Sequence, residues 1–526
     1  MSFFAKINAK QQMGIAALIM GLSVLLSRFM GLFRDKVISW QFGASGETDL
    51  YFSAFVIPDF LNHLLAGAYV SITLIPILSK LMEQDQEDAW KFFSSVLLWA
   101  SSLVLGLTIF LWIFAPLFAP ILAPGFTEEQ IQRLVTFLRI ILPAQVCFIP
   151  GACFAALLYI RKKFTIPALM PLIYNGMILL CGVLFPYLGI AQGMEGFCWG
   201  VFFGAFLGAF YLPYLAAKSD GITFYFVWKH TKLKHLLFLA FPLILGQSIV
   251  VLDEQFIRIF GSLAGTGEVS LLSYSRRIMM VPVGVVAQAA GVASFPFLAQ
   301  LFAKNDFEAF NATLNNALKN TLVIVLPISL YLISVANPVL GLIFEGGQFN
   351  QSDTILASPY LQIMLIAVPF WAFQQILGRA FYAMENTKTP AIVGTIITLI
   401  TIPIYAYFVP IFGGISIAII TTASIGTYAL VMFFVGRKKF LNAYKGLLCL
   451  FGKNMLLNTL PFILCVSISF WLPKMFISHF SMLLTQFLQI GLSGIIYLIS
   501  YFILAKIFMP QNITLILSPF LKRLKK

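Results

Sequence analysis

Charged side chains are scarce in this sequence. Only 10% of its 526 residues are Asp, Glu, Lys or Arg, whereas 60% are hydrophobic. A water-soluble domain could not bury so much apolar surface, so the composition excludes a soluble fold. The net charge of +14 could indicate nucleic-acid binding, but the lysines and arginines follow the pattern of membrane topology described below. We therefore expect a polytopic membrane protein and no nucleic-acid partner.

Sequence motifs for metal and nucleotide chemistry are also missing. There is no HExxH or CxxC pattern and no glycine-rich loop carrying a nucleotide-binding lysine. The six cysteines lie in apolar runs, so we interpret them as packing residues rather than as a disulfide framework. No predicted cytoplasmic segment is long enough to form an ATPase domain. The sequence thus predicts neither an enzyme nor a bound cofactor, and a monovalent cation gradient or the membrane potential would have to drive any pumping.

Apolar stretches long enough to cross a bilayer occur fourteen times. With the N-terminus in the cytoplasm, 22 lysines and arginines fall on the cytoplasmic side and two, Arg133 and Lys474, on the other side. This positive-inside bias predicts fourteen helices and two cytoplasmic termini. The first span has no small-residue cleavage site before it and is expected to remain as a helix. The predicted spans are 13–40, 50–79, 92–122, 134–160, 166–189, 193–217, 235–260, 270–300, 314–344, 354–383, 389–409, 412–436, 454–472 and 483–508.

The prolines indicate an internal repeat. Four proline pairs are separated by 220 to 226 residues: Pro58 and Pro282, Pro76 and Pro296, Pro143 and Pro369, and Pro167 and Pro390. This offset predicts two parallel six-helix bundles with two further helices at the C-terminus, and substrate sites in such proteins lie between the halves. We expect an N-terminal lobe at 1–217, a cytoplasmic linker at 218–234, a second lobe at 235–436, a second linker at 437–453, and the extra helices with a basic tail at 454–526.

The first span contains four ionisable residues, which are costly at membrane depth and usually face a polar cavity. On a helix, Arg28 and Asp35 fall about 20° apart, with Gly31 between them along the axis. Guanidinium groups match phosphate geometry, so this helix is a candidate phosphate-binding element. The alternative for Arg34 and Lys36 is that both reach the membrane interface.

The second span carries Asp59, Asn62 and His63 beside Pro58. A proline in a membrane helix leaves a backbone carbonyl without its helical donor, so we expect a break or kink here. Asp59 is expected to be either a polar cavity residue or the counter-ion of one of the arginines in the first span. His63 is either a cavity residue or a hydrogen-bonded packing residue.

The seventh and eighth spans carry the other group of intramembrane charges. Glu254 and Arg258 have i, i+4 spacing and could neutralise one another. That would leave Asp253 without a local partner, so it is a candidate for binding a coupling cation or proton, or for pairing with an arginine of the eighth span. Arg276 and Arg277 cannot share one helix face, so one is expected to serve the cavity and the other a carboxylate or a lipid headgroup.

Several motifs together resemble the MurJ (MviN) family of lipid II flippases, within the multidrug/oligosaccharidyl-lipid/polysaccharide exporter superfamily. The resemblance runs over almost the whole chain. It is carried by Ser27-Arg28-Phe29-Met30-Gly31-Leu32-Phe33-Arg34-Asp35, Phe42-Gly43-Ala44, Thr48-Asp49-Leu50-Tyr51-Phe52, Tyr274-Ser275-Arg276-Arg277-Ile278-Met279, and Phe381-Tyr382-Ala383 with Asn386-Thr387-Lys388-Thr389-Pro390.

The resemblance implies a flippase that moves lipid II, the undecaprenyl-pyrophosphate-linked peptidoglycan precursor, from the inner to the outer leaflet of the bacterial cytoplasmic membrane. It also implies membrane lipids and the cell-wall synthesis machinery as partners. Arginines of the first and eighth spans would line a cationic cavity. The expected pyrophosphate ligands are Arg28, Arg34, Arg277 and the adjacent Arg276, with Asp35, Asp59, Asn62 and His63 as orienting or cavity residues and Asp253 as the coupling-ion residue.

Two departures from the family pattern are visible. Asn62-His63 stands where family members often have arginines, and Arg276 stands where many have aspartate. The alternative within transporters is therefore a cation-coupled exporter of drugs or of another lipid-linked oligosaccharide. A membrane glycosyltransferase would also bind polyprenyl phosphates, but it would need a long outer loop with catalytic acids or a metal site.

Overall fold

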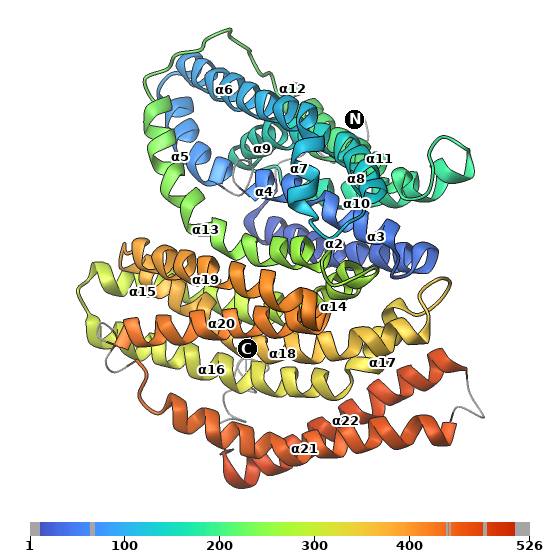
Figure 1. Cartoon of the computed structure of the whole chain (residues 1–526). Helices are drawn as coiled ribbons and strands as arrows, with labels where there is room; N and C mark the ends of the chain where they lie inside the picture. Colours follow the sequence, from blue (N-terminus) through green and yellow to red (C-terminus); the bar gives the residue numbers. More distant parts are fainter. Residues whose placement is uncertain (1–10, 64–68, 438–439, 441–442, 477–480, 511–526) are drawn as a thin grey trace. The chain divides into compact units, whose positions relative to one another are not determined.

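The computed structural model describes residues 11–63, 69–437, 440, 443–476 and 481–510, and these residues are almost entirely helical (Figure 1). Their one recorded pairing outside helices and turns is an isolated bridge between Gly346 and Phe349. The all-α fold class predicted from the sequence is confirmed. The chain divides into two compact units, Met1–Ser270 and Leu271–Lys526.

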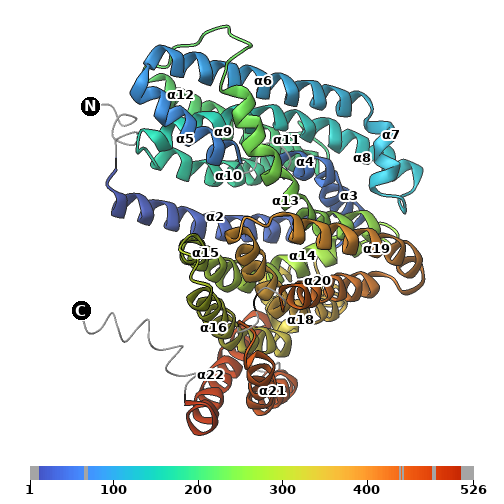
Figure 2. The ribbon, with the colours of Figure 1, turned by 90° about the vertical axis from the view of Figure 1, so that its left-hand side faces the viewer.

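Unit 1 contains the helices of the first six predicted spans and, in addition, the seventh. Figure 2 shows α2 extended beside α10, against which it packs. The helix α13 packs against α4 and α5. The helices of this unit are α2 (Met13–Phe42), α3 (Gly46–Ala54), α4 (Val56–Leu61), α5 (Tyr69–Gln84), α6 (Gln86–Ile113), α7 (Ala115–Leu122), α8 (Glu128–Ile141), η2 (Leu142–Ala144), α9 (Gln145–Ile160), α10 (Thr165–Tyr187), α11 (Glu195–Gly204), η3 (Ala205–Tyr211), α12 (Leu212–Lys218), α13 (Leu233–Gly261) and the start of α14 (Glu268–Pro282).

Unit 2 contains the rest of α14 and the remaining predicted spans. The helix α18 contacts α15, α16 and α20, and α21 packs on α22. The further helices of this unit are η4 (Val283–Ala287), α15 (Gln288–Ala303), α16 (Phe307–Ser334), α17 (Ala336–Phe344), α18 (Gln351–Ala383), α19 (Lys388–Phe412), α20 (Gly414–Arg437), α21 (Leu447–Phe476) and α22 (Met482–Phe508).

Twelve helical stretches among the described residues are long and apolar enough to cross a membrane. The two predicted spans outside this set correspond to α3 to α5, which is interrupted, and to α13, which is 29 residues long. The chain is therefore a multi-pass membrane protein. The predicted cytoplasmic termini lie outside the described residues.

Helix ends repeat along the chain with the same offset as the prolines. Asp85 caps α6 and Asp306 caps α16, each by accepting hydrogen bonds from backbone N–H groups of the first turn. Thr127 and Asn350 each form a reciprocal capping box, at α8 and α18. The members of these pairs are separated by 221 and 223 residues, so these helix starts recur at the offset of the prolines.

Prolines interrupt the corresponding helices of both halves. Pro58 cannot donate the hydrogen bond that the carbonyl of Ala54 would accept, and α3 ends at Ala54. In the second half, α14 ends at Pro282 and a π-helical stretch, η4, follows. The expected break near Pro58 is present.

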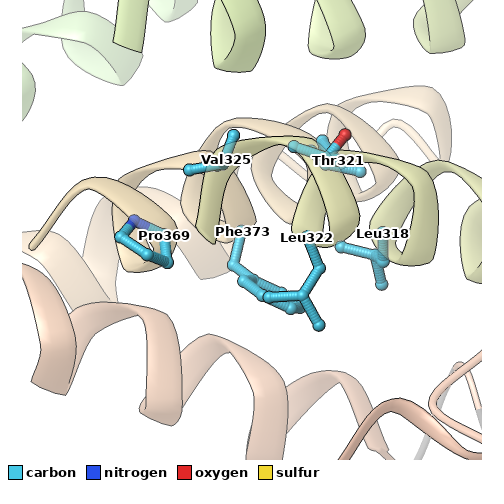
Figure 3. A pocket seen from close by; sticks show the side chains of 8 residues that line it. Leu318, Thr321, Leu322, Val325, Pro369 and Phe373 are labelled. Atoms are coloured by element: carbon cyan, nitrogen blue, oxygen red, sulfur yellow. The ribbon is translucent and has the colours of Figure 1, made fainter. Parts of the chain in front are cut away.

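A small apolar pocket lies between α16 and α18 in unit 2 (Figure 3). Thr321 and Val325 of α16 and Pro369 and Phe373 of α18 are among the residues that line it. Apart from the hydroxyl of Thr321, the lining is apolar, so this pocket offers no charged group to a ligand.

We expect the loops around Arg161 and Lys232 to face the cytoplasm and those around Gly265 and Gly346 to face outward, because of the positive-inside bias. Single cysteines introduced at these positions should react with an impermeant thiol reagent from opposite sides of the membrane. The one exposed cysteine among the described residues, Cys449, must first be replaced by serine. Labelling of all four positions from the same side would contradict the fourteen-helix topology.

Candidate functional site

Arg34 of α2 is held by an ion pair with the next residue, Asp35. The Nε and Nη2 atoms of Arg34 donate to Oδ1 of Asp35 at 3.0 and 2.9 Å, and Nη1 donates to Oδ1 of Asn175 on α10 at 3.1 Å. Asp35 is 1% exposed and Arg34 is 13% exposed. Arg34 is therefore fixed in orientation and largely neutralised, rather than extended to the membrane interface.

Arg28 has a different environment on the same helix. Its side chain is exposed, and Gly31, one turn away, has open space where a side chain would stand. No ion pair of Arg28 is recorded among the described residues. This guanidinium can thus accept an incoming anion without first losing a carboxylate.

Asp59 pairs with Arg258, not with an arginine of the first span. Its Oδ2 atom accepts from Nη1 of Arg258 at 2.6 Å, while Nη2 of the same arginine donates to Glu254 at 2.6 Å. The i, i+4 pair of Glu254 and Arg258 is present as the spacing indicates. The expectation that Asp59 holds Arg28 or Arg34 is not met, because the buried Arg258 from α13 reaches it instead.

Unit 1 thus contains two groups of paired polar side chains. One is Arg34 with Asp35 and Asn175, and the other is Arg258 with Asp59 and Glu254. We call these six residues the polar cluster.

The other two candidates of the second predicted span lie just after α4. His63 is exposed, and its Nδ1 atom hydrogen-bonds with the carbonyl of Asp59 at 2.8 Å. Asn62 is half-buried. The geometry of His63 is local and fits a capping contact of the broken helix.

Asp253 precedes the Glu254–Arg258 pair on α13. It is half-buried and takes part in an interaction within the structure, so it is not an unpartnered carboxylate. An interaction of Asp253 agrees with the alternative in which this carboxylate pairs within the protein, and its assignment to a coupling ion stays a prediction.

The two arginines of α14 point to different environments in unit 2. Arg276 is 5% exposed, and its guanidinium lies 5.4 Å from the centre of the Trp371 ring. Arg277 is exposed. Adjacent residues on a helix point in different directions, and the two arginines accordingly lie in different surroundings. Arg276 is buried and packs on an aromatic ring, so it does not reach a lipid headgroup.

Asp49, part of one of the family-like motifs, anchors a turn. It is fully buried, and its carboxylate accepts from the backbone N–H of Gly267 at 2.5 Å, the N–H of Ser270 at 2.8 Å and the hydroxyl of Ser270 at 2.5 Å. These donors belong to the start of α14, where backbone N–H groups have no helical acceptor. We call this set of hydrogen bonds the Asp49 anchor.

Sequence reasoning did not identify Asn175, which binds Arg34. It could have been found, because it is a carboxamide in an otherwise apolar span and such residues usually hydrogen-bond across helices.

The family model described as lipid II flippase MurJ matches residues 38–490, a range that begins after Arg28, Arg34 and Asp35. The lipid II flippase MurJ of Thermosipho africanus is 28% identical over 407 residues, which cover 77% of this chain and 82% of that protein. The probable lipid II flippase MurJ of Buchnera aphidicola subsp. Acyrthosiphon pisum is 28% identical over 373 residues, 70% and 73% of the two chains.

Solved structures of related proteins have the same fold. The structure of a lipid II flippase MurJ in an inward closed conformation superposes with a TM-score of 0.75 at 25% identity, covering 94% of this chain and 100% of that one. An inward-facing multidrug transporter of the MATE family superposes with a TM-score of 0.66 at 15% identity over 82% of this chain, which shows a shared fold alone. With a family match over most of its length, this chain belongs to the MurJ family of lipid II flippases.

Proposed function

We propose that this protein moves lipid II from the inner to the outer leaflet of the bacterial cytoplasmic membrane by alternating access. The observation that carries the proposal is the exposed Arg28 beside the open space at Gly31, on the same helix that holds Arg34 in a fixed orientation. A pyrophosphate cannot enter hydrocarbon unescorted, and a bidentate guanidinium is suited to accompany it.

The two arginines of α2 would have different roles. Arg28 would form the first ion pair with the pyrophosphate, because a carboxylate does not compete for it among the described residues. Arg34 would contribute through its remaining hydrogen-bonding capacity, with Asp35 and Asn175 keeping its guanidinium in place. In unit 2 the exposed Arg277 is the residue we assign to the same cargo, and the buried Arg276 would support the helix by packing on Trp371.

The cargo's polyprenyl tail requires an apolar surface. The helices α21 and α22 expose many large apolar side chains, including Leu456, Phe470, Trp471 and Phe487. We assign the tail to this pair of helices. We also propose that both termini of the chain face the cytoplasm, the side on which lipid II is made.

The test is rescue of a bacterium depleted of its own lipid II flippase. Expression of this chain should restore growth and the appearance of lipid II at the outer surface. Failure to rescue while the protein accumulates in the membrane, together with export of a different lipid-linked oligosaccharide, would favour the alternative cargo suggested by Asn62 and His63.

A further inference from the structure

A second cationic site lies in unit 1, away from the polar cluster. A pocket of about 330 Å³ is lined by Trp112, Thr136, Arg139, Ile140, Pro143, Trp199 and Phe202. These residues come from the end of α6, from α8 with the following turn, and from α11. The pocket has one charged group, Arg139, set among aromatic and aliphatic side chains.

The pocket is built around a proline. Pro143 has no N–H, so it cannot donate the helical hydrogen bond that the carbonyl of Arg139 would accept. The indole Nε1 of Trp112 donates to this carbonyl instead, at 3.1 Å. The guanidinium of Arg139 lies 5.2 Å from the centre of the same Trp112 ring. Trp112 thus contacts both the backbone and the side chain of Arg139, and the cation–π contact holds the guanidinium in place.

Arg139 differs from the other arginine of α8. Arg133 forms ion pairs with Glu47, at 2.9 Å, and with Glu195. Arg139 is exposed, and no carboxylate partner is recorded for it among the described residues. Its positive charge is therefore available to an anion from outside the chain.

The depth of the pocket identifies the kind of anion. Trp112 lies ten residues before the outer end of the predicted span 92–122, and Arg139 lies five residues inside the outer end of the span 134–160. The pocket is then in the outer half of the bilayer, at a depth from which the long side chain of Arg139 reaches the headgroups. Beside the pocket, Ile113, Leu117 and Ile121 are more than half exposed, as expected of a surface covered by acyl chains.

We propose that this pocket binds the phosphodiester headgroup of an anionic phospholipid of the outer leaflet, with Arg139 as the anion ligand and the two tryptophans as its walls. A lipid satisfies both features of the site, because its phosphate meets the guanidinium and its acyl chains cover the flanking apolar side chains. The proposal concerns a resident membrane lipid and is independent of the transported cargo.

The test is titration of the purified full-length protein in detergent with phosphatidylglycerol, with bound lipid counted by native mass spectrometry. We expect one phosphatidylglycerol to bind more tightly than phosphatidylcholine. Arg139→Gln should weaken that binding about tenfold, the effect of losing one hydrogen bond to a charged group. Arg139→Lys, which keeps the charge without the planar fork, should weaken it less.

Lys91→Gln serves as the matched control, because Lys91 is also an exposed cation but lies at the other end of α6. Equal binding by wild type and Arg139→Gln, or equal weakening by Lys91→Gln, would overturn the assignment. Equal binding of phosphatidylcholine would overturn the preference for an anionic lipid. Displacement of the lipid by millimolar inorganic phosphate would show a free-anion site and contradict the lipid as occupant. An unchanged melting temperature of Arg139→Gln separates lost binding from unfolding.

Discussion

Replacing Arg28 by alanine is expected to abolish rescue of flippase-depleted cells while the protein still reaches the membrane. Arg28 is exposed, so its removal leaves no buried group unpaired and should not unfold the protein. What is lost is a guanidinium contact with the pyrophosphate in a site of low dielectric, and two such hydrogen bonds correspond to about 3–6 kcal/mol. Transport should fall at least about a hundredfold. The measurements are growth at matched expression and accessibility of lipid II at the outer surface.

Two further variants define the contact with Arg28. Arg28→Lys keeps the charge but not the planar fork, and we expect about a tenfold loss of transport rather than complete loss. Lys91→Ala removes an exposed cation at the end of α6 and should have no effect. Normal growth of Arg28→Ala at ordinary expression would refute the assignment of Arg28 to the pyrophosphate.

Asp35→Ala is expected to destabilise the folded protein by about 3–5 kcal/mol, because it leaves the buried guanidinium of Arg34 without its carboxylate. The melting temperature of the purified protein should fall, and its amount in the membrane should fall with it. Glu87→Ala is the matched comparison: it breaks the exposed i, i+4 pair with Lys91 and should change stability by less than about 0.5 kcal/mol.

Adding Arg34→Met to Asp35→Ala should recover much of the lost stability, because no buried cation is then left unpaired. The double variant should still fail to rescue flippase-depleted cells, since Arg34 and the carboxylate that orients it are both gone. A double variant that is as unstable as Asp35→Ala alone would show that Asp35 acts through other partners. A double variant that rescues growth would remove Arg34 and Asp35 from the proposed mechanism.

The fold was accessible from the sequence because a membrane leaves few choices. Backbone groups in hydrocarbon must be satisfied within a helix, so apolar runs and the distribution of lysine and arginine suffice to place the spans. The prolines predict a repeat, and the helix caps at Asp85 and Asp306 have a similar spacing.

The candidate site was less accessible, because pairing partners come from helices far apart in the sequence. Spacing within one helix correctly paired Glu254 with Arg258 but could not show that Asp59, 199 residues earlier, shares that arginine. For Asp253 the sequence left two possibilities open, a coupling ion and an arginine of the eighth span, because spacing along the chain does not decide between them. The assignments of Arg28, Arg34 and Arg277 to the cargo remain predictions.

The Asp49 anchor also bears on the rate of conformational change. It joins the segment after α2 to the start of α14 across 218 residues of sequence, through three hydrogen bonds to one buried carboxylate. Any step of a transport cycle that separates these segments must exchange all three bonds for water together. If this adds even about 4 kcal/mol to the barrier, the step slows about a thousandfold. Asp49 would then set the dwell time of the state described here, and so the interval in which a slowly diffusing lipid can find Arg28 before the cycle proceeds.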